Sequence, residues 1–176
     1  SMKGVVLLTN AMADINRASF SSLRIRGKCS DMTLAFATMS TLLMTDATLA
    51  DGVSIAFTRC VVVRTVHVDR VALFRGAMLI LDGVDVTWAL PPENTPPFSK
   101  ITFRDFLVSQ RSSFEMRNCT TVTGYALPSV QFENATIADG SMHVISDMTV
   151  SYIVRSEYGR HWQSGGGIAY DDNCST

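Results

Sequence analysis

The sequence predicts an all-β chain folded as a right-handed parallel β-helix with coils of about 24 residues. Three observations lead to this prediction. Four segments align with one another without gaps, their apolar residues alternate with a period of two, and turn residues recur at one shared position. Stacked coils pair through parallel strands and place like residues on like, so a small apolar face in each coil becomes part of a continuous core.

The repeated segment reads apolar-x-apolar-x-polar-apolar-x-apolar, and we interpret it as a strand that bends at its polar residue. It occurs four times in the chain, at residues 42–49, 66–73, 101–108 and 130–137. A looser copy lies at residues 6–13. Two pairs of mostly apolar residues follow each segment at fixed offsets, and in the first full coil these are Ile55 with Phe57 and Cys60 with Val62. Each coil is therefore expected to hold three short strands whose alternate residues face inward.

The spacing of the four segments varies for reasons that are visible in the sequence. The second and third intervals between their first residues are longer than the first, as the positions show: Leu42, Val66, Ile101 and Val130. The proline-rich residues 90–99 and the turn-rich residues 123–129 account for the two longer intervals, and we expect 91–99 to protrude from a corner of the coil. A turn-forming pair occupies the same place in three of the four coils, at Asp51-Gly52, Arg75-Gly76 and Asp139-Gly140; the third coil has Gln110-Arg111 there instead.

Two other architectures fit the pattern less well. A leucine-rich repeat needs the frame L-x-x-L-x-L-x-x-N, which the segments do not keep, and a β-sandwich does not predict gap-free alignment of consecutive segments. We therefore assign residues 1–151 to the β-helix, with an irregular first coil at 4–40. Residues 152–176 lose the repeat and are expected to form an irregular C-terminal coil or tail. We interpret the chain as a fragment of a longer repeat protein whose flanking coils are its neighbours.

One outward column of the predicted stack contains three charged residues, Asp69, Arg104 and Glu133. We interpret them as a ladder of exposed ion pairs, each of which contributes little to stability, and therefore predict no catalytic residue. The alternative is the catalytic site of a polysaccharide lyase or hydrolase of the pectin-lyase-like class. In that case the two carboxylates would lie roughly 10 Å apart with an arginine between them.

A second polar column falls where each strand bends, and its members are Asn10, Asp46, Arg70, Asp105 and Asn134. Asparagine and aspartate tolerate such bends because their side chains can bond to the nearby backbone. We interpret this column as structural.

The four cysteines, Cys29, Cys60, Cys119 and Cys174, show no CxxC or other metal-ligand spacing, so we predict no metal site and no cofactor. Cys60 and Cys119 share one inward column, and Cys29 is a candidate for the same column. Buried free thiols that act as small hydrophobic groups are the favoured interpretation. A disulfide between Cys29 and Cys60 is the alternative if their coils are adjacent.

Three N-x-S/T sequons, at Asn118, Asn134 and Asn173, are candidate glycosylation sites and favour a secreted or cell-surface protein. The chain has 18 Ser and 17 Thr but only 18% charged residues, which indicates an uncharged polar surface. Its net charge of -1 gives no electrostatic reason to expect nucleic acid as a partner.

Three segments resemble the repeats of the dispersed gene family proteins of trypanosomes, namely 101–105 (ITFRD), 116–120 (MRNCT) and 130–143 (VQFENATIADGSMH). The similarity extends over residues 40–150 in the style of the repeat, without a diagnostic motif or a functional residue to transfer. It implies a very large surface or secreted glycoprotein with β-helical regions and an adhesive role. We therefore predict a non-enzymatic surface or secreted module for adhesion or for ligand or glycan binding, whose partner is a host or cell-surface protein or glycan.

Overall fold

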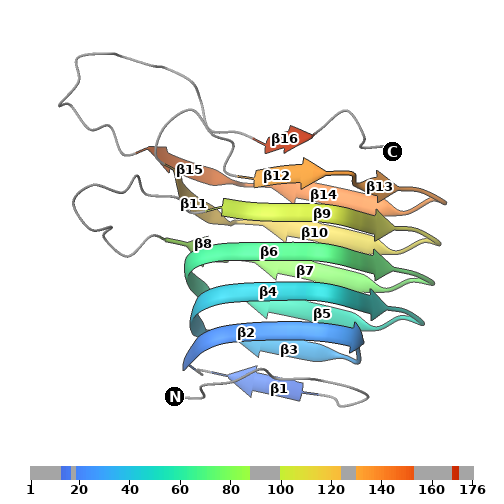
Figure 1. Ribbon diagram of the computed structural model, residues 1–176, viewed down its shortest axis with the longest axis horizontal. Coiled ribbons are helices and arrows are strands. Elements are labelled where there is room, and N and C mark those ends of the chain that lie inside the picture. Colours follow the sequence, from blue (N-terminus) through green and yellow to red (C-terminus); the bar gives the residue numbers. More distant parts are fainter. Residues whose placement is uncertain (1–12, 17–18, 88–99, 124–129, 153–167, 171–176) are drawn as a thin grey trace.

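The computed structural model describes residues 13–16, 19–87, 100–123, 130–152 and 168–170. These residues form parallel β-strands in two sheets, and no helix occurs among them (Figure 1). They accordingly contain no helix that is long and apolar enough to cross a membrane. The expectation of an all-β chain with parallel pairing is confirmed.

Each sheet is built from strands that lie far apart in the sequence. The six-stranded sheet contains, in spatial order, β1 (Ala13–Asn16), β3 (Met32–Ala35), β5 (Ser54–Thr58), β7 (Met78–Asp82), β10 (Ser113–Arg117) and β14 (Met142–Ser146). The ten-stranded sheet contains β2 (Ser19–Lys28), β4 (Thr38–Leu49), β6 (Val61–Leu73), β8 (Asp85–Val86), β9 (Lys100–Val108), β11 (Thr120–Thr123), β12 (Val130–Glu133), β13 (Thr136–Ile137), β15 (Thr149–Tyr152) and β16 (Ile168–Tyr170).

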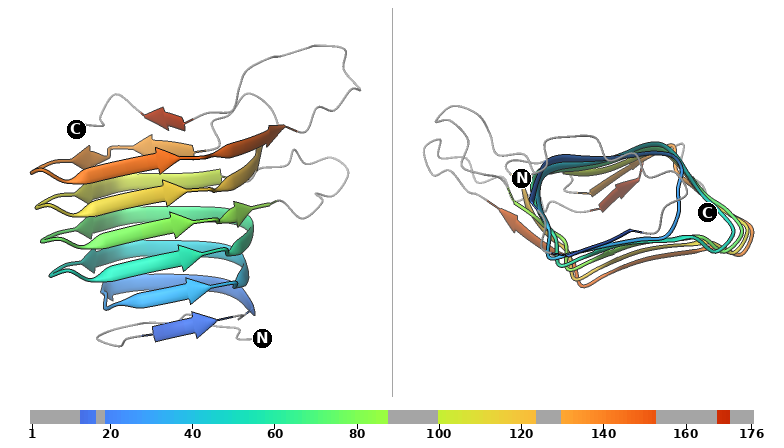
Figure 2. Two further views of the ribbon diagram at one scale, coloured as in Figure 1. Left: turned by 180° about the vertical axis from the view of Figure 1, so that it is seen from behind. Right: turned by 90° about the horizontal axis from the view of Figure 1, so that it is seen from below.

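Consecutive strands occupy one level of both sheets, and we call such a level a row. In row 38–58, β4 lies in one sheet and β5 in the other, and both pair in parallel with their equivalents in row 61–82. Seen along the stack, the rows superimpose around a shared interior (Figure 2, right).

The register between rows matches the sequence alignment. Val66 pairs with both Leu42 and Ile101, and Ile101 pairs with Val130. In the six-stranded sheet, Ile55, Leu79, Phe114 and His143 are aligned in the same way. The four predicted segments therefore stack as expected, because a slip of one residue would turn every apolar side chain outward.

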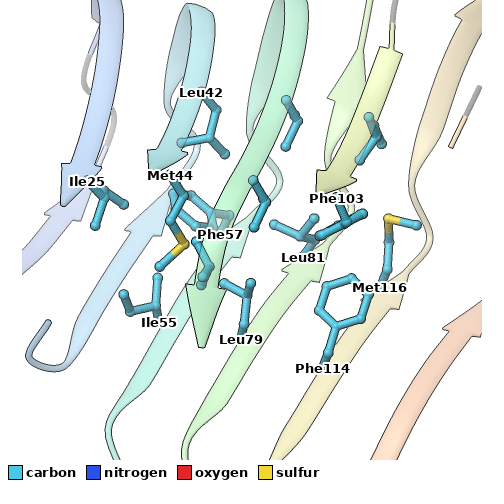
Figure 3. Packing of buried hydrophobic residues seen from close by; sticks show 14 of the residues in the cluster. Ile25, Leu42, Met44, Ile55, Phe57, Leu79, Leu81, Phe103, Phe114 and Met116 are labelled. Atoms are coloured by element: carbon cyan, nitrogen blue, oxygen red, sulfur yellow. The ribbon is translucent and has the colours of Figure 1, made fainter. Parts of the chain in front are cut away.

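The inward residues of each column form one continuous core (Figure 3). Five phenylalanines are at most 1% exposed, and four of them gather in the later rows, at Phe103, Phe106, Phe114 and Phe132. The Phe103 ring stacks on that of Phe132 with 4.7 Å between centroids, and His143 lies 5.2 Å from the Phe132 ring. Burial lowers the pKa of His143.

The chain bends between strands at residues with positive φ, which recur in columns. One column contains Asp46, Arg70, Asp105 and Asn134, with φ of 51°, 52°, 47° and 53°. These are four of the five residues of the predicted bend column; Asn10 lies outside the described residues. A further column, which the sequence did not indicate, contains Phe36, Arg59, Gly83, Asn118 and Asp147.

The sequence alignment did not recover the row at 19–35. Leu23 and Ile25 pair with Leu42 and Met44, and both are almost fully buried. Lys28 at the end of β2 pairs with Thr48, and Met32 at the start of β3 pairs with Ile55. Three residues, 29–31, connect Lys28 to Met32, whereas six, 49–54, connect Thr48 to Ile55. This shortened turn, together with a bulge after Ile25, shifts the phase and hides the row from a gap-free comparison.

The repeat also returns after the last predicted segment. Ile168 pairs with Val130 and Tyr170 with Phe132, so β16 adds a strand to β12 in register. The interval from Val130 to Ile168 is longer than any between the four segments, which concealed this relation in the sequence. The stacking therefore extends into the region 152–176 that the sequence indicated to be irregular.

The proline-rich insertion lies at a corner where the preceding row has a connection of only two residues. In β6, only Val63 and Arg64 separate Val62 from Thr65, whereas the whole of 87–99 separates their partners Val86 and Lys100. Residues 91–99, for which we predicted a protruding loop, lie outside the described residues.

Replacing residues 87–99 with Val-Arg, the link used in β6, should lower the free energy of unfolding by less than about 1 kcal/mol. The reason is that the flanking strands already pair in register and loop-closure entropy depends weakly on length. Urea denaturation followed by circular dichroism measures the change. A loss above about 3 kcal/mol would show that the insertion packs as core.

Candidate functional site

The three charged residues singled out in the sequence lie on neighbouring strands of the ten-stranded sheet. Asp69 of β6 pairs in register with Arg104 of β9, which pairs with Glu133 of β12. Each follows a residue buried in the core, so the alternation of the strand gives all three outward register positions. The predicted column is therefore present.

Arg104 and Glu133 are in direct contact. Arg104 Nε donates to Glu133 Oε2 over 2.8 Å, and Arg104 Nη2 lies 2.7 Å from the same oxygen. Glu133 raises the pKa of the Arg104 guanidinium. The pair thus has the contact that the ladder interpretation expects.

Asp69 binds a different arginine. Its Oδ2 is ion-paired with Nη1 of Arg70, the next residue in the chain. Consecutive strand residues normally point to opposite faces, but the φ of 52° at Arg70 breaks this alternation. Arg70 Nε also donates to Asp46 Oδ1 over 2.6 Å, and Arg26 lies 3.0 Å from the other oxygen of Asp46. The sequence did not predict the Asp69–Arg70 pair, although Arg70 at the bend position was the available signal.

Asp69 is 7% exposed, which is low for a charged residue at an outward register position. Its Oδ1 is buried and has no hydrogen-bond partner among the described residues. Thr102 is 6% exposed and pairs in register with His67, at outward positions two residues before Arg104 and Asp69. We call His67, Asp69, Thr102, Arg104 and Glu133 the polar face.

The polar face offers hydrogen-bond donors and acceptors on a regular grid. Neighbouring strands are about 4.8 Å apart, and outward residues along one strand are about 6.6 Å apart. Such an array can bind a ligand that carries many hydroxyl groups. For general acid–base chemistry, one carboxyl group must be free to exchange a proton with the substrate. Here Arg104 holds Glu133, and Arg70 holds Asp69.

Two of the three candidate glycosylation sites lie on the surface at bends. Asn118 and Asn134 are exposed and have φ of 51° and 53°. The Nδ2 atom of Asn118 donates to Asp82 Oδ1 over 3.0 Å, and that of Asn134 donates to Asp105 Oδ1. Asn173 lies outside the described residues.

The described cysteines are free and buried, as the favoured interpretation expected. Burial raises the pKa of the Cys29 and Cys119 thiols to about 11 and also raises that of Cys60. Cys29, the candidate for the column of Cys60, does not lie in that column. Lys28 pairs with Thr48, so Cys29 is level with Leu49. Cys60 is level with Ala37 instead, because the N–H of Val61, the residue after Cys60, donates to the carbonyl of Ala37. The alternative disulfide is therefore absent.

No group of three or more His, Cys, Asp or Glu side chains in the described part of the chain is arranged to hold a metal ion. Comparison with known proteins found no matching family model, no similar curated protein and no similar solved structure.

Proposed function

We propose that the chain is a section of a right-handed parallel β-helix that serves as a non-enzymatic surface or secreted binding module. Parallel pairing between successive rows, together with recurrent bends, supports a coil of about 24 residues as its unit. Parallel strands joined by a crossover are almost always connected in the right-handed sense, which supports the handedness.

The binding role rests on one observation, the buried Oδ1 of Asp69 within a face of hydrogen-bonding groups. An unpartnered buried acceptor is costly, and a ligand hydroxyl that displaces the neighbouring side chains and donates to it would remove that cost. Thr102 and His67 are neighbouring groups for further hydroxyls. We infer that the ligand is a glycan of a host or cell surface.

The exposed sequons support passage through a secretory pathway. We expect glycans at Asn118 and Asn134 when the chain is expressed through that pathway in eukaryotic cells, because both side chains are exposed at bends. Intact mass before and after treatment with a peptide N-glycosidase measures their occupancy. Thr120→Ala should remove the glycan from Asn118, whereas Thr120→Ser should retain it. An unmodified secreted chain contradicts the prediction.

The binding proposal and its enzymatic alternative are separated by two assays on the same proteins. A glycan array should show binding by the parent chain and about tenfold weaker binding by Asp69→Ala, since Asp69 supplies the unsatisfied acceptor. Arg75→Ala is the matched control, because it breaks an ion pair with Asp51 at a different bend. Binding that is absent from the parent, or unchanged in Asp69→Ala, opposes the proposal.

Arg104→Ala should change the free energy of unfolding by less than about 1 kcal/mol, because the Arg104 side chain is 52% exposed and solvent screens its pair with Glu133. We expect no cleavage of acidic polysaccharides by the parent or by this variant, measured as release of reducing or unsaturated ends. Cleavage by the parent that disappears in a folded Arg104→Ala protein would instead favour a polysaccharide lyase.

A further inference from the structure

The ion pairs around Asp69 determine which kind of sugar its side chain can accept. Asp69 Oδ2 is paired with Arg70, and Asp69 Oδ1 is buried without a hydrogen-bond partner in the described part of the chain. We propose that the sugar that contacts Asp69 is uncharged, with hydroxyl groups but no carboxylate or sulfate group. This inference rests on the binding role proposed above and names the class of glycan that the polar face accepts.

The arginines beside Asp69 already have carboxylate partners. Arg70 Nε donates to Asp46 Oδ1 over 2.6 Å, and this bond raises the pKa of the Arg70 guanidinium. Arg104 Nε and Nη2 both contact Glu133 Oε2, at 2.8 Å and 2.7 Å. The charge of each guanidinium is therefore compensated within the protein. An acid group on a ligand would have to compete with these carboxylates for an arginine.

The carboxylates of the same region are less completely compensated than the arginines. Asp69 leaves one oxygen unpartnered, and Asp105 Oδ1 accepts from the uncharged amide of Asn134. Glu133, and to a smaller extent Asp69 and Asp105, raise the pKa of the Arg104 guanidinium, so these charges act on one region. An acceptor that lacks a cation favours a hydroxyl donor, whereas an additional anion at the same place is repelled.

Lys100 lies on the same side of β9 but further along the strand. It has the outward position four residues before Arg104, which is about 13 Å away along the strand. Thr102, which lies between them and is 6% exposed, offers an uncharged hydroxyl group. A longer glycan can reach Lys100 with another of its sugars, so the exclusion of acid groups applies to the sugar at Asp69.

The test compares uncharged disaccharides with acidic counterparts in which each primary hydroxyl group is oxidised to a carboxylate. Disaccharides of glucose, galactose and mannose are titrated against the full chain and followed by NMR. We expect each disaccharide that binds to do so at least about tenfold more weakly once it is oxidised. Binding of the uncharged form should change less than about twofold between about 0.05 M and about 0.5 M NaCl.

The outcomes separate this inference from the binding role on which it rests. Equal or tighter binding of the acidic disaccharides would overturn the inference but leave the binding role intact. A chain that binds neither these probes nor any glycan of the array would refute the binding role, and the inference with it.

Glu133→Gln tests the physical cause, because it releases Arg104 from a charged partner with little change in side-chain size. The released guanidinium should raise the affinity for the acidic disaccharides at least about threefold, and added salt should reduce this gain. Asp51→Asn is the matched control: it also removes one negative charge, but it releases Arg75 at a different bend. Circular dichroism checks that both variants are folded. An affinity for acidic disaccharides that rises equally in both variants, or in neither, would overturn the inference.

Discussion

Replacing Phe103 with alanine should lower the free energy of unfolding by about 3–5 kcal/mol, the largest loss that we expect from a single substitution. Phe103 is 0% exposed, and its ring lies 4.7 Å from that of Phe132, 4.8 Å from Phe114 and 5.2 Å from Phe106. Truncation would leave a cavity between rows, because strand spacing is fixed by backbone hydrogen bonds and the walls cannot close on it. Urea denaturation followed by circular dichroism measures the loss.

Two companion variants make this result specific. Phe103→Leu keeps most of the buried volume and should cost about 1–2 kcal/mol. Arg104→Ala, at the adjacent outward position, should cost less than about 1 kcal/mol. If Phe103→Ala costs no more than Arg104→Ala, then the aromatic side chains do not form a packed core.

At the shared turn, replacing a glycine should lower the free energy of unfolding, whereas introducing a glycine should raise it. The second turn residue has positive φ in each of the four rows that the alignment recovered, with glycine at 52, 76 and 140 and Arg111 in the remaining row. Gly76→Val should lower the free energy of unfolding by about 2–3 kcal/mol, because β-branched residues strongly disfavour a φ of 76°. Apart from position 76 itself and its two chain neighbours, no heavy atom lies within 4 Å of the added Cβ, so the cost arises from the backbone. Arg111→Gly should raise stability by about 0.5–1 kcal/mol.

Gly76→Asn separates backbone strain from side-chain effects. Asparagine tolerates the left-handed region, so this variant should cost less than half as much as Gly76→Val. Thermal and urea denaturation of the four proteins are compared under one condition. A destabilised Arg111→Gly protein would show that the Arg111 side chain matters more than its backbone conformation.

The register of the sheets was predictable because it depends on two simple repeats in the sequence. Alternation with a period of two assigned Met44, Val68 and Phe103 to the interior, and gap-free alignment placed them over one another. The row at 19–35 and the strand β16 escaped detection because turns and insertions vary in length, which leaves the strands paired but breaks the spacing. The alternation of apolar residues within each strand therefore survives an insertion, whereas the spacing between successive strands does not.

The candidate site was predictable only where it depends on the register of regular strands. The sequence placed Arg104 beside Glu133 because both occupy one column of regular strands. It did not indicate that Asp69 pairs with Arg70, because that contact depends on a left-handed residue that directs two consecutive side chains to one place. Nor did it indicate the burial of Asp69, which depends on the conformations of neighbouring side chains.

The three buried thiols in the described part of the chain can report on local opening of the fold. Cys29, Cys60 and Cys119 belong to different rows, and burial raises the pKa of each thiol, so little reactive thiolate is present while the rows are closed. Alkylation at each position therefore requires the surrounding strands to separate first. Comparing the alkylation rates of the three residues would rank the stability of the stack along its length, without any engineered label.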